Sequence, residues 1–328
     1  MIIPTCSDVQ RAAQRLAGQA VRTPLMRSPA LDEQTGRQLF FKPECLQRTG
    51  SFKFRGAFNR LSQLTREERS LGVIAWSSGN HAQGVACAAQ QLGINARIVM
   101  PADAPAIKRR NTEAYGATVI PYDRYSEDRE AIAYALAERD GGIIVPSFDD
   151  PFIIAGQGTV GLELFEDAAA QGIVLDALVV CCSGGGLVAG CALAAEVASP
   201  STAIYCVEPV GFDDHRRSLQ SGLREHIDNE SRSICDALLA PMPGELTFAI
   251  NKQRLAGGLT VSDEAVRHAM IAAFDQLKLV VEPGGAVGLA AMLENLLPES
   301  HQRIGVVLSG GNVDPQLFVS ILDRANSL

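Results

Sequence analysis

Residues 73–92, VIAWSSGNHAQGVACAAQQL, hold the pattern that decides the predicted fold. An apolar run at 73–76 suits a short buried strand, a glycine-containing polar turn follows it, and residues 82–92 have helical spacing. The alternation continues downstream, with strand-like runs at 96–100, 119–120 and 143–145 and helical patterns at 106–115 and 126–139. Strands that alternate with helices predict a parallel sheet, so we expect one compact βαβαβα unit at about residues 70–148.

The same alternation returns in the second half of the chain. Strand-like runs lie at 177–182, 203–207 and 304–308, and helical patterns lie at 187–198, 262–278 and 286–296. Residues 218–255 have weak periodicity and several Pro and Gly residues, which predicts loops and short helices. At roughly 100–200 residues per domain, a chain of 328 residues is long enough for two domains of the α/β class.

The composition argues against several classes of function. A formal net charge of −8 argues against nucleic acid or an anionic membrane as a partner, because both require clustered Lys and Arg. The one basic cluster, residues 108–110, is predicted to lie on a solvated helix face. No apolar run approaches the ~20 residues of a membrane span, and residues 1–12 lack the pattern of a signal peptide. We therefore expect a soluble, cytoplasmic protein that acts on a small molecule.

The cysteines and histidines do not form a recognisable metal site. The chain has eight cysteines without a C-x-x-C pair, and five scattered histidines without an H-E-x-x-H sequence. We expect the cysteines to be buried small hydrophobes in a reducing compartment, and we do not expect a histidine zinc site.

Two glycine-rich turns each follow a predicted strand. The first, Ser183-Gly184-Gly185-Gly186-Leu187, precedes a helix, so backbone N–H groups and the helix dipole favour a phosphate there. No G-K-[ST] sequence follows, which argues against a nucleotide P-loop. Gly184, Gly186 and Ala189 also fit the loose dinucleotide fingerprint, with Glu208 at the end of the next strand. A nicotinamide-dependent oxidoreductase therefore remains open at this point.

The second turn, Ser309-Gly310-Gly311-Asn312, ends the strand-like run at 304–308. Ligands of parallel sheets gather at the carboxyl ends of the strands. Ser309 offers a hydroxyl group that can donate to, or accept from, a ring nitrogen.

Lys53 stands in an unusual setting for a lysine. It lies between Phe52 and Phe54, and the small polar residues 49–51 lead directly into a predicted helix. A lysine in an apolar pocket loses proton affinity and becomes an amine nucleophile, so we single out Lys53 as a reactive amine.

Taken together, these segments resemble the fold-type II pyridoxal-phosphate enzymes, and more narrowly the serine/threonine dehydratase and serine racemase family. TGSFKFRGA at 49–57 resembles the cofactor-lysine motif of that family, and SSGNHAQG at 77–84 resembles its asparagine loop. The other matching segments follow in family order: AGQGT at 155–159, SGGGL at 183–187, EP at 282–283 and SGGNVD at 309–314. The resemblance covers about residues 20–325.

The resemblance implies a tryptophan synthase β-like α/β fold with two parallel-sheet domains. Residues 1–68 plus 149–328 would form a large cofactor-binding domain, and residues 69–148 a small domain. The active site would lie in the cleft between them, and the protein would be a homodimer.

The resemblance also implies a role for each matching residue. Lys53 would bind pyridoxal 5'-phosphate covalently and act as the base, with Ser78 as the second catalytic residue. The cofactor-binding residues would be Phe52, Lys53, Asn80, Ser183, Gly184, Gly185, Gly186, Leu187, Glu282 and Ser309. The substrate-binding residues would be Ser51, Ser78, Asn80 and His81. A serine at position 309, rather than a carboxylate, suits elimination better than transamination.

A further segment, EPVGFDD at 208–214, resembles the divalent-cation loop of the family. Glu208, the carbonyl group of Phe212 and Asp214 would supply hard oxygen ligands for Mg²⁺ or Ca²⁺. Three positions depart from the family pattern in segments that line its pocket, and these are Ala237, Ala240 and Gly284. A pocket with fewer hydroxyl groups favours a bulkier β-substituent on the substrate.

The resemblance therefore implies a pyridoxal-phosphate-dependent dehydratase, an ammonia-lyase that converts a β-hydroxy amino acid to a 2-oxo acid and ammonia. The substrate would be of the serine or threonine type, or a bulkier 3-hydroxy amino acid. A serine-type racemase is the main alternative. The nicotinamide-dependent oxidoreductase and a non-catalytic binding protein are more distant ones.

Overall fold

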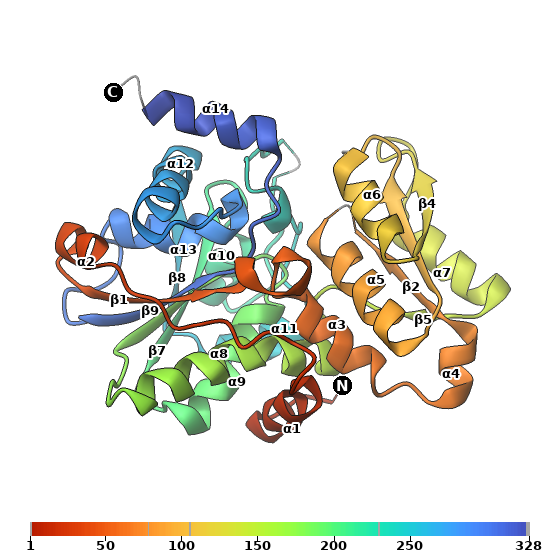
Figure 1. Cartoon of the computed structure of the whole chain (residues 1–328), viewed down its shortest axis with the longest axis horizontal. Helices are drawn as coiled ribbons and strands as arrows, with labels where there is room; N and C mark the ends of the chain where they lie inside the picture. Colours follow the sequence, from red (N-terminus) through yellow and green to blue (C-terminus); the bar gives the residue numbers. More distant parts are fainter. Residues whose placement is uncertain (1, 78, 105, 229, 326–328) are drawn as a thin grey trace.

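The computed structural model describes residues 2–77, 79–104, 106–228 and 230–325. Within these residues two parallel sheets form two units that lie side by side (Figure 1). The larger sheet has the strand order β1-β9-β6-β7-β8, with β1 at Gln38–Pro43, β6 at Ala177–Cys181, β7 at Ala203–Pro209, β8 at Gly257–Val261 and β9 at Arg303–Leu308. The smaller sheet has the order β4-β3-β2-β5, with β2 at Val73–Trp76, β3 at Ala96–Pro101, β4 at Thr118–Tyr122 and β5 at Ile143–Ile144. All neighbouring strands run parallel, which confirms the predicted α/β class.

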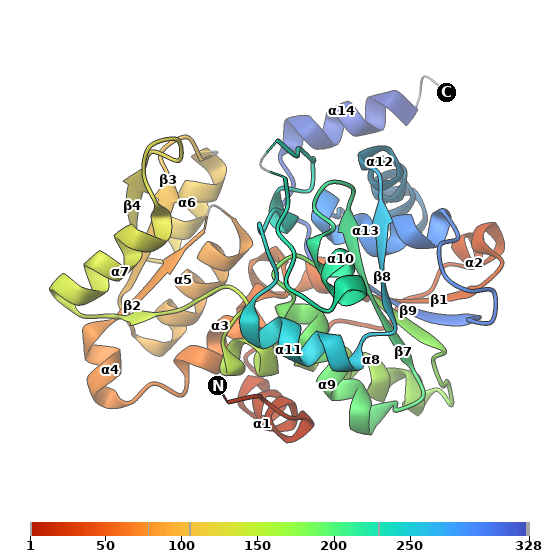
Figure 2. The same cartoon turned by 180° about the vertical axis from the view of Figure 1, so that it is seen from behind.

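Helices surround both sheets (Figures 1 and 2). Around the smaller sheet they are α4 (Arg66–Leu71), α5 (Asn80–Leu92), α6 (Ala106–Ala114) and α7 (Arg129–Asp140). The longer helices of the rest of the chain are α1 (Cys6–Leu16), α2 (Pro29–Thr35), α3 (Lys53–Leu61), α8 (Pro151–Ala170), α9 (Gly186–Ala198), α10 (Asp214–Ser221), α11 (Glu245–Arg254), α12 (Asp263–Ala272), α13 (Pro283–Leu293) and α14 (Pro315–Ala325). Short turns are η1 (Glu44–Leu46), η2 (Arg48–Gly50), η3 (Asp236–Leu238) and the π-helical η4 (Ala273–Leu277). Among the described residues, no helix is both long and apolar enough to cross a membrane.

The strands of the smaller sheet are buried on both faces. Val73 and Ile98 belong to the apolar cluster that includes α5, whereas Ile74 and Val99 pack with Ala133 of α7. The two views accordingly show α5 and α7 on opposite sides of this sheet (Figures 1 and 2). Burial on both faces explains why the strands are continuous apolar runs rather than alternating ones.

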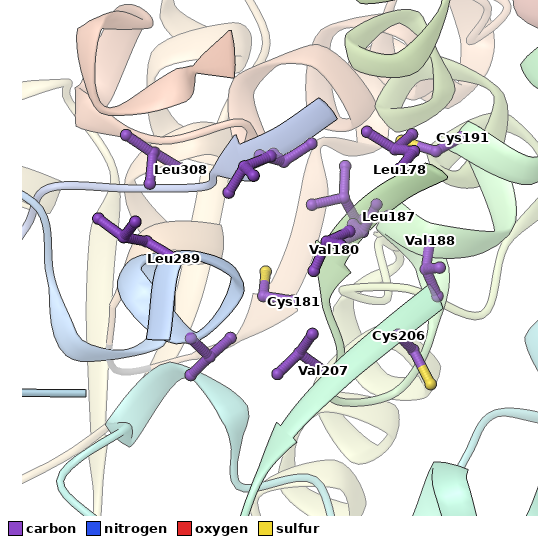
Figure 3. Packing of buried hydrophobic residues seen from close by; sticks show 14 of the residues in the cluster. Leu178, Val180, Cys181, Leu187, Val188, Cys191, Cys206, Val207, Leu289 and Leu308 are labelled. Carbon is purple, nitrogen blue, oxygen red and sulfur yellow. The ribbon is translucent and has the colours of Figure 1, made fainter. Parts of the chain in front are cut away.

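The larger sheet is the centre of the main apolar core. Figure 3 shows side chains of β6, β7 and β9 interdigitating with those of α9 and α13. Cys181, Cys191 and Cys206 lie among them and serve as small apolar side chains. All eight cysteines of the chain are free, and Cys45 is half-buried while the other seven are buried. The prediction of unpaired, buried cysteines is therefore confirmed for all but Cys45.

Helix α8 packs closely on two other helices because glycines remove the side chains between them. A Cβ atom at Gly158 would lie 2.6 Å from the carbonyl oxygen of Gly190 in α9. A Cβ atom at Gly156 would lie 2.5 Å from the carbonyl oxygen of Arg55 in α3. These two glycines belong to the AGQGT segment, so that segment sets how closely α3 and α9 approach α8.

Most predicted elements are present, but their bounds differ in several places. The strands at 73–76, 96–100, 177–182, 203–207 and 304–308 are confirmed, and the helix predicted at 286–296 spans Pro283–Leu293. The segment 218–255 contains η3 and the ten-residue helix α11 besides loops. Residues of α3, such as Phe54 and Phe58, pack into the core of the smaller sheet. The domain boundary at residue 68 stays a prediction.

We expect the substitution Gly158→Ala to lower the free energy of unfolding by about 2 kcal/mol, because the added Cβ atom would press on the α9 backbone. Gly257→Ala is the matched control, since its Cβ atom would meet the Tyr205 ring at an ordinary 3.5 Å. Urea unfolding measures both variants. A Gly158→Ala protein as stable as the control would contradict the close packing of α8 on α9.

Candidate active site

Two motifs that are far apart in the sequence lie side by side at the carboxyl end of β9. Ser51 forms an isolated antiparallel bridge with Gly310, and the backbone N–H of Phe52 donates to the carbonyl oxygen of Ser309 at 3.1 Å. The side chain of Asn312 donates to the carbonyl oxygen of Thr49 at 2.7 Å. The glycine-rich turn after β9 therefore holds the segment that leads into Lys53, at the start of α3.

The amine of Lys53 is surrounded by protein, although its side chain as a whole is only half-buried. Its Nζ atom donates to the carbonyl oxygen of Ser147 at 2.9 Å and lies 5.0 Å from the centre of the Phe52 ring. None of the described carboxylates lies within ion-pair distance of it. Burial lowers the pKa of Lys53 to about 8, so a usable fraction of the amine is unprotonated near neutral pH.

Asn80 joins two further motifs at the first position of α5. Its side-chain amide donates to Glu282 Oε1 at 2.6 Å, and its Oδ1 atom accepts from the amide of Asn312 at 2.8 Å. Burial, together with repulsion from Asp236, raises the pKa of Glu282 to about 7. The asparagine loop, the Glu-Pro segment and the turn after β9 therefore meet around one hydrogen-bonded chain of side chains.

The structure constrains the remaining predicted substrate residues. His81 is buried, and its Nε2 atom lies 2.9 Å from the carbonyl oxygen of Val145. Burial, followed by the charge of Lys53, lowers the pKa of His81 to about 3, so its ring stays neutral. The hydroxyl group of Ser51 is buried and has no hydrogen-bond partner among the described residues. Ser78 lies outside the described residues.

The first glycine-rich turn joins β6 to α9 and has a polar backing. The carbonyl oxygen of Gly184 accepts from the Thr247 hydroxyl at 2.5 Å, and that of Gly185 accepts from the Asn251 side chain at 3.2 Å. Gly185 has φ 94, a left-handed conformation that favours glycine. Among the hydrogen bonds of the described residues, none uses the N–H groups of Gly184 or Gly185. The carbonyl groups are thus satisfied on one side while N–H groups stay available for an anion.

Two other predicted cofactor residues flank this turn. The Ser183 hydroxyl accepts from the backbone N–H of Ala240 at 3.1 Å. Ser309 is buried at the end of β9, next to Cys181 at the end of β6. Burial raises the pKa of Cys181 to about 11 despite a hydrogen bond with the Ser309 side chain, so this thiol stays protonated at neutral pH. The carboxyl ends of neighbouring strands therefore bring the two predicted cofactor turns to one edge of the larger sheet.

The residues predicted to bind a cation also lie close together, where β7 passes into α10. Both carboxylate oxygens of Glu208 accept from the backbone at this helix start, from His215 at 3.0 Å and Arg216 at 2.8 Å. The Oδ2 atom of Asp214 is buried and has no partner among the described residues. Burial raises the pKa of Asp214 to about 7. Among the described residues, no three Asp, Glu, His or Cys side chains form a group that could hold a metal.

Three contacts of the site were not predicted from the sequence. The carbonyl group of Ser147 gives no sequence signal, because any residue could supply it. Asn312 is part of the SGGNVD segment, so that resemblance could have identified it. Lys108 was expected on a solvated helix face, and this is wrong, because its side chain is 15% exposed and pairs with Asp236 at 2.5 Å.

The chain matches known proteins over most of its length. The family model described as pyridoxal-phosphate dependent enzyme matches residues 16–310. An L-threo-3-hydroxyaspartate ammonia-lyase from a Pseudomonas species is 48% identical over 98% of this chain and 99% of its own. A serine racemase from Schizosaccharomyces pombe is 42% identical over 99% of each.

Solved structures agree with these sequence relatives. A bacterial-type match, the threonine deaminase of T.th., has a TM-score of 0.90 and 44% identity, covering 95% of this chain and 99% of its own. A maize serine racemase has a TM-score of 0.91 and 38% identity, covering 99% of each chain. These matches confirm the predicted fold, enzyme class and pyridoxal-phosphate cofactor, and they exclude the nicotinamide-dependent alternative. This chain belongs to the family of pyridoxal-phosphate-dependent enzymes.

Proposed function

We propose that this protein is an ammonia-lyase that dehydrates a 3-hydroxy amino acid of the L-threo-3-hydroxyaspartate type, releasing a 2-oxo acid and ammonia. The observation that carries the proposal is the lone buried amine of Lys53, which faces the meeting point of the asparagine loop and the turn after β9. The Pseudomonas relative, 48% identical over nearly the whole chain, supports the choice of substrate.

The residues around Lys53 fit pyridoxal phosphate. In this proposal Lys53 holds the cofactor, the Phe52 ring packs beside it, and the free N–H groups of residues 184–187 bind its phosphate. Asn80 and Ser309 contact the ring substituents, and Glu282 orients Asn80. When bound, the cofactor supplies an electron sink for negative charge at the α-carbon of the substrate.

The chain itself supplies the proton transfers. The pKa of Lys53, lowered to about 8 by burial, lets this amine accept the α-proton near neutral pH. The net reaction removes water across the α- and β-carbons, and hydrolysis of the resulting enamine gives the 2-oxo acid and ammonia. Ser309 offers the ring nitrogen a neutral hydroxyl group, which favours elimination over transamination. Ser51, His81 and the start of α5 would surround the substrate carboxylate.

The departures from the family pattern lie beside this site. A Cβ atom at Gly284 would lie 3.1 Å from Leu238 and 3.3 Å from Ala237, so the η3 turn packs directly on Gly284. A hydroxyl-bearing residue at position 284 would therefore require the η3 turn to shift. These contacts give the pocket an apolar wall there, in place of a group that binds the side-chain hydroxyl of serine or threonine.

A serine-type racemase is the competing proposal, because the Schizosaccharomyces pombe relative bears that name. Both reactions begin with removal of the α-proton by Lys53. They differ in whether the α-carbon is reprotonated from the opposite face or loses its β-hydroxyl. A β-substituent that stabilises the developing double bond favours loss of the hydroxyl.

We also propose a divalent cation at Glu208, the Phe212 carbonyl group and Asp214. The buried, unpartnered Oδ2 atom of Asp214 supports this proposal, since burying such a group without a ligand is costly. Burial, with repulsion from Asp214 as a further cause, raises the pKa of Glu208 well above its usual value, which a cation would offset. A homodimer and a cytoplasmic location remain proposals as well, the latter supported by the eight free cysteines.

We expect Lys53→Ala to lose the visible absorption band of the bound cofactor and to lower turnover by several orders of magnitude, because it removes both nucleophile and base. Absorption spectra and 2-oxo acid release measure the two effects. Lys252→Ala, which removes an exposed lysine, should leave both unchanged. Near-normal turnover in Lys53→Ala would overturn the proposal.

Among L-threo-3-hydroxyaspartate, L-serine, L-threonine and 3-phenylserine, we expect the first to have the highest kcat/KM, at least about tenfold above L-serine. The measurements are 2-oxo acid release, α-deuterium exchange and chiral analysis of the remaining amino acid. Elimination should exceed racemisation. Preference for L-serine, with more D-serine than pyruvate formed, would instead support the racemase.

We expect a chelator to lower the thermal stability of the protein and Mg²⁺ to restore it, because a ligand that binds only the folded state stabilises that state. Asp214→Ala should abolish this response. Asp263→Ala, which removes a carboxylate near the start of another helix, should retain it. If the wild-type protein ignores the chelator and contains no divalent ion by elemental analysis, the proposed cation site is absent.

A further inference from the structure

An ion pair joins the two units of the molecule beside the site. Lys108 in α6, next to the smaller sheet, pairs with Asp236 in η3 at 2.5 Å between Nζ and Oδ2. Both views place α6 at the edge of the smaller unit that faces the larger one (Figures 1 and 2). The Lys108 side chain is 15% exposed and that of Asp236 is 52% exposed. The lysine is thus held inward, whereas the aspartate borders solvent.

The ammonium group of Lys108 lies over the loop that precedes Asn80. A Cβ atom at Gly79 would lie 3.8 Å from Lys108 Nζ, closer than any other heavy atom. Both members of the pair also act on Glu282, since the Asp236 charge raises its pKa and the Lys108 charge lowers it. Glu282 in turn accepts from Asn80. The pair therefore borders the space in front of Lys53 where an amino acid would bind.

We propose that Lys108 binds the second carboxylate of a dicarboxylic substrate, and that this carboxylate displaces Asp236 from the ammonium group. This inference rests on the proposed function, because it names the group that selects 3-hydroxyaspartate over serine and threonine. Asp236 supplies the same chemical group, a carboxylate oxygen at hydrogen-bond distance, that the substrate would supply.

The exchange is physically reasonable on both sides. Asp236 is half-exposed on a short 3-10 turn, so its side chain can turn into water, and ion pairs open to solvent are weak. Glu282 and Asp236 are the carboxyl groups facing this space, and both would repel a dicarboxylate that lacked a cation partner. With an uncharged β-substituent, as in serine or threonine, the Lys108–Asp236 pair stays intact.

A different role would be a simple latch between the two units, and the two substitutions distinguish these roles. In a latch, Lys108→Met and Asp236→Asn impair every substrate alike, because either change breaks the same pair. In a carboxylate subsite the two changes act in opposite directions on dicarboxylates. Lys108→Met removes the binding group, whereas Asp236→Asn removes its competitor.

The test compares kcat and KM for L-threo-3-hydroxyaspartate and L-threonine in the holoenzyme. We expect Lys108→Met to lower kcat/KM for hydroxyaspartate roughly 30-fold, mainly through KM, as for the loss of one charged hydrogen bond. The effect on L-threonine should stay below about threefold. Asp236→Asn should lower KM for hydroxyaspartate, and Lys108→Arg should keep most of the wild-type preference. Arg110→Met, which removes an exposed cation from the same helix, should change neither substrate.

A binding measurement separates this inference from the proposed function. The affinities of the holoenzyme for L-aspartate and L-alanine, which lack the β-hydroxyl group, are compared by calorimetry. We expect the wild-type protein to bind L-aspartate more tightly and Lys108→Met to lose that preference, whatever the enzyme does with hydroxyaspartate. Equal losses for both ligands, or an unchanged preference in Lys108→Met, would overturn the subsite. If wild-type protein releases no 2-oxo acid from hydroxyaspartate, the proposed function fails instead.

Discussion

The site depends on how the fold treats two buried lysines that lie close in sequence. A buried ammonium group must either find a carboxylate or lose proton affinity. Lys42 is fully buried and is paired with Glu163 at 2.7 Å. Arg55, also fully buried, is paired with Glu44 and with Glu163, each at 2.7 Å. These carboxylates are committed to Lys42 and Arg55, and Lys53 has only the Ser147 carbonyl group among the described residues.

The same network fixes the helix that carries Lys53. Arg55 lies two residues further along α3, and its partners come from the segment after β1 and from α8. Burial by itself would raise the pKa of Glu163, but the hydrogen bonds from Arg55 outweigh it and the pKa is lowered. Close contact of Gly156 with the α3 backbone adds a steric constraint. The start of α3 is thus held in place by charge and packing, while its amine remains unpaired and able to react.

The sequence allowed the fold class and most of the site to be predicted, because both depend on local patterns. Apolar runs and glycine-rich turns predicted the parallel sheets and the turns at their carboxyl ends. The sequence did not indicate which groups meet across the cleft. Lys108 illustrates this, since its neighbours in sequence are basic and polar, and only the folded chain brings Asp236 to it. The strand β8, GGLTV, was missed because its two glycines hide the strand pattern.

The account predicts that cofactor chemistry belongs to the unpaired lysine alone. The most direct test is reduction of the holoenzyme with borohydride, followed by proteolysis and mass spectrometry of the peptides that contain Lys42, Lys53 and Lys108. We expect one pyridoxyl group per chain, on Lys53, with the other two lysines unmodified. A pyridoxyl group on Lys42 or Lys108, or an unmodified Lys53 in protein that contains the cofactor, would contradict the account.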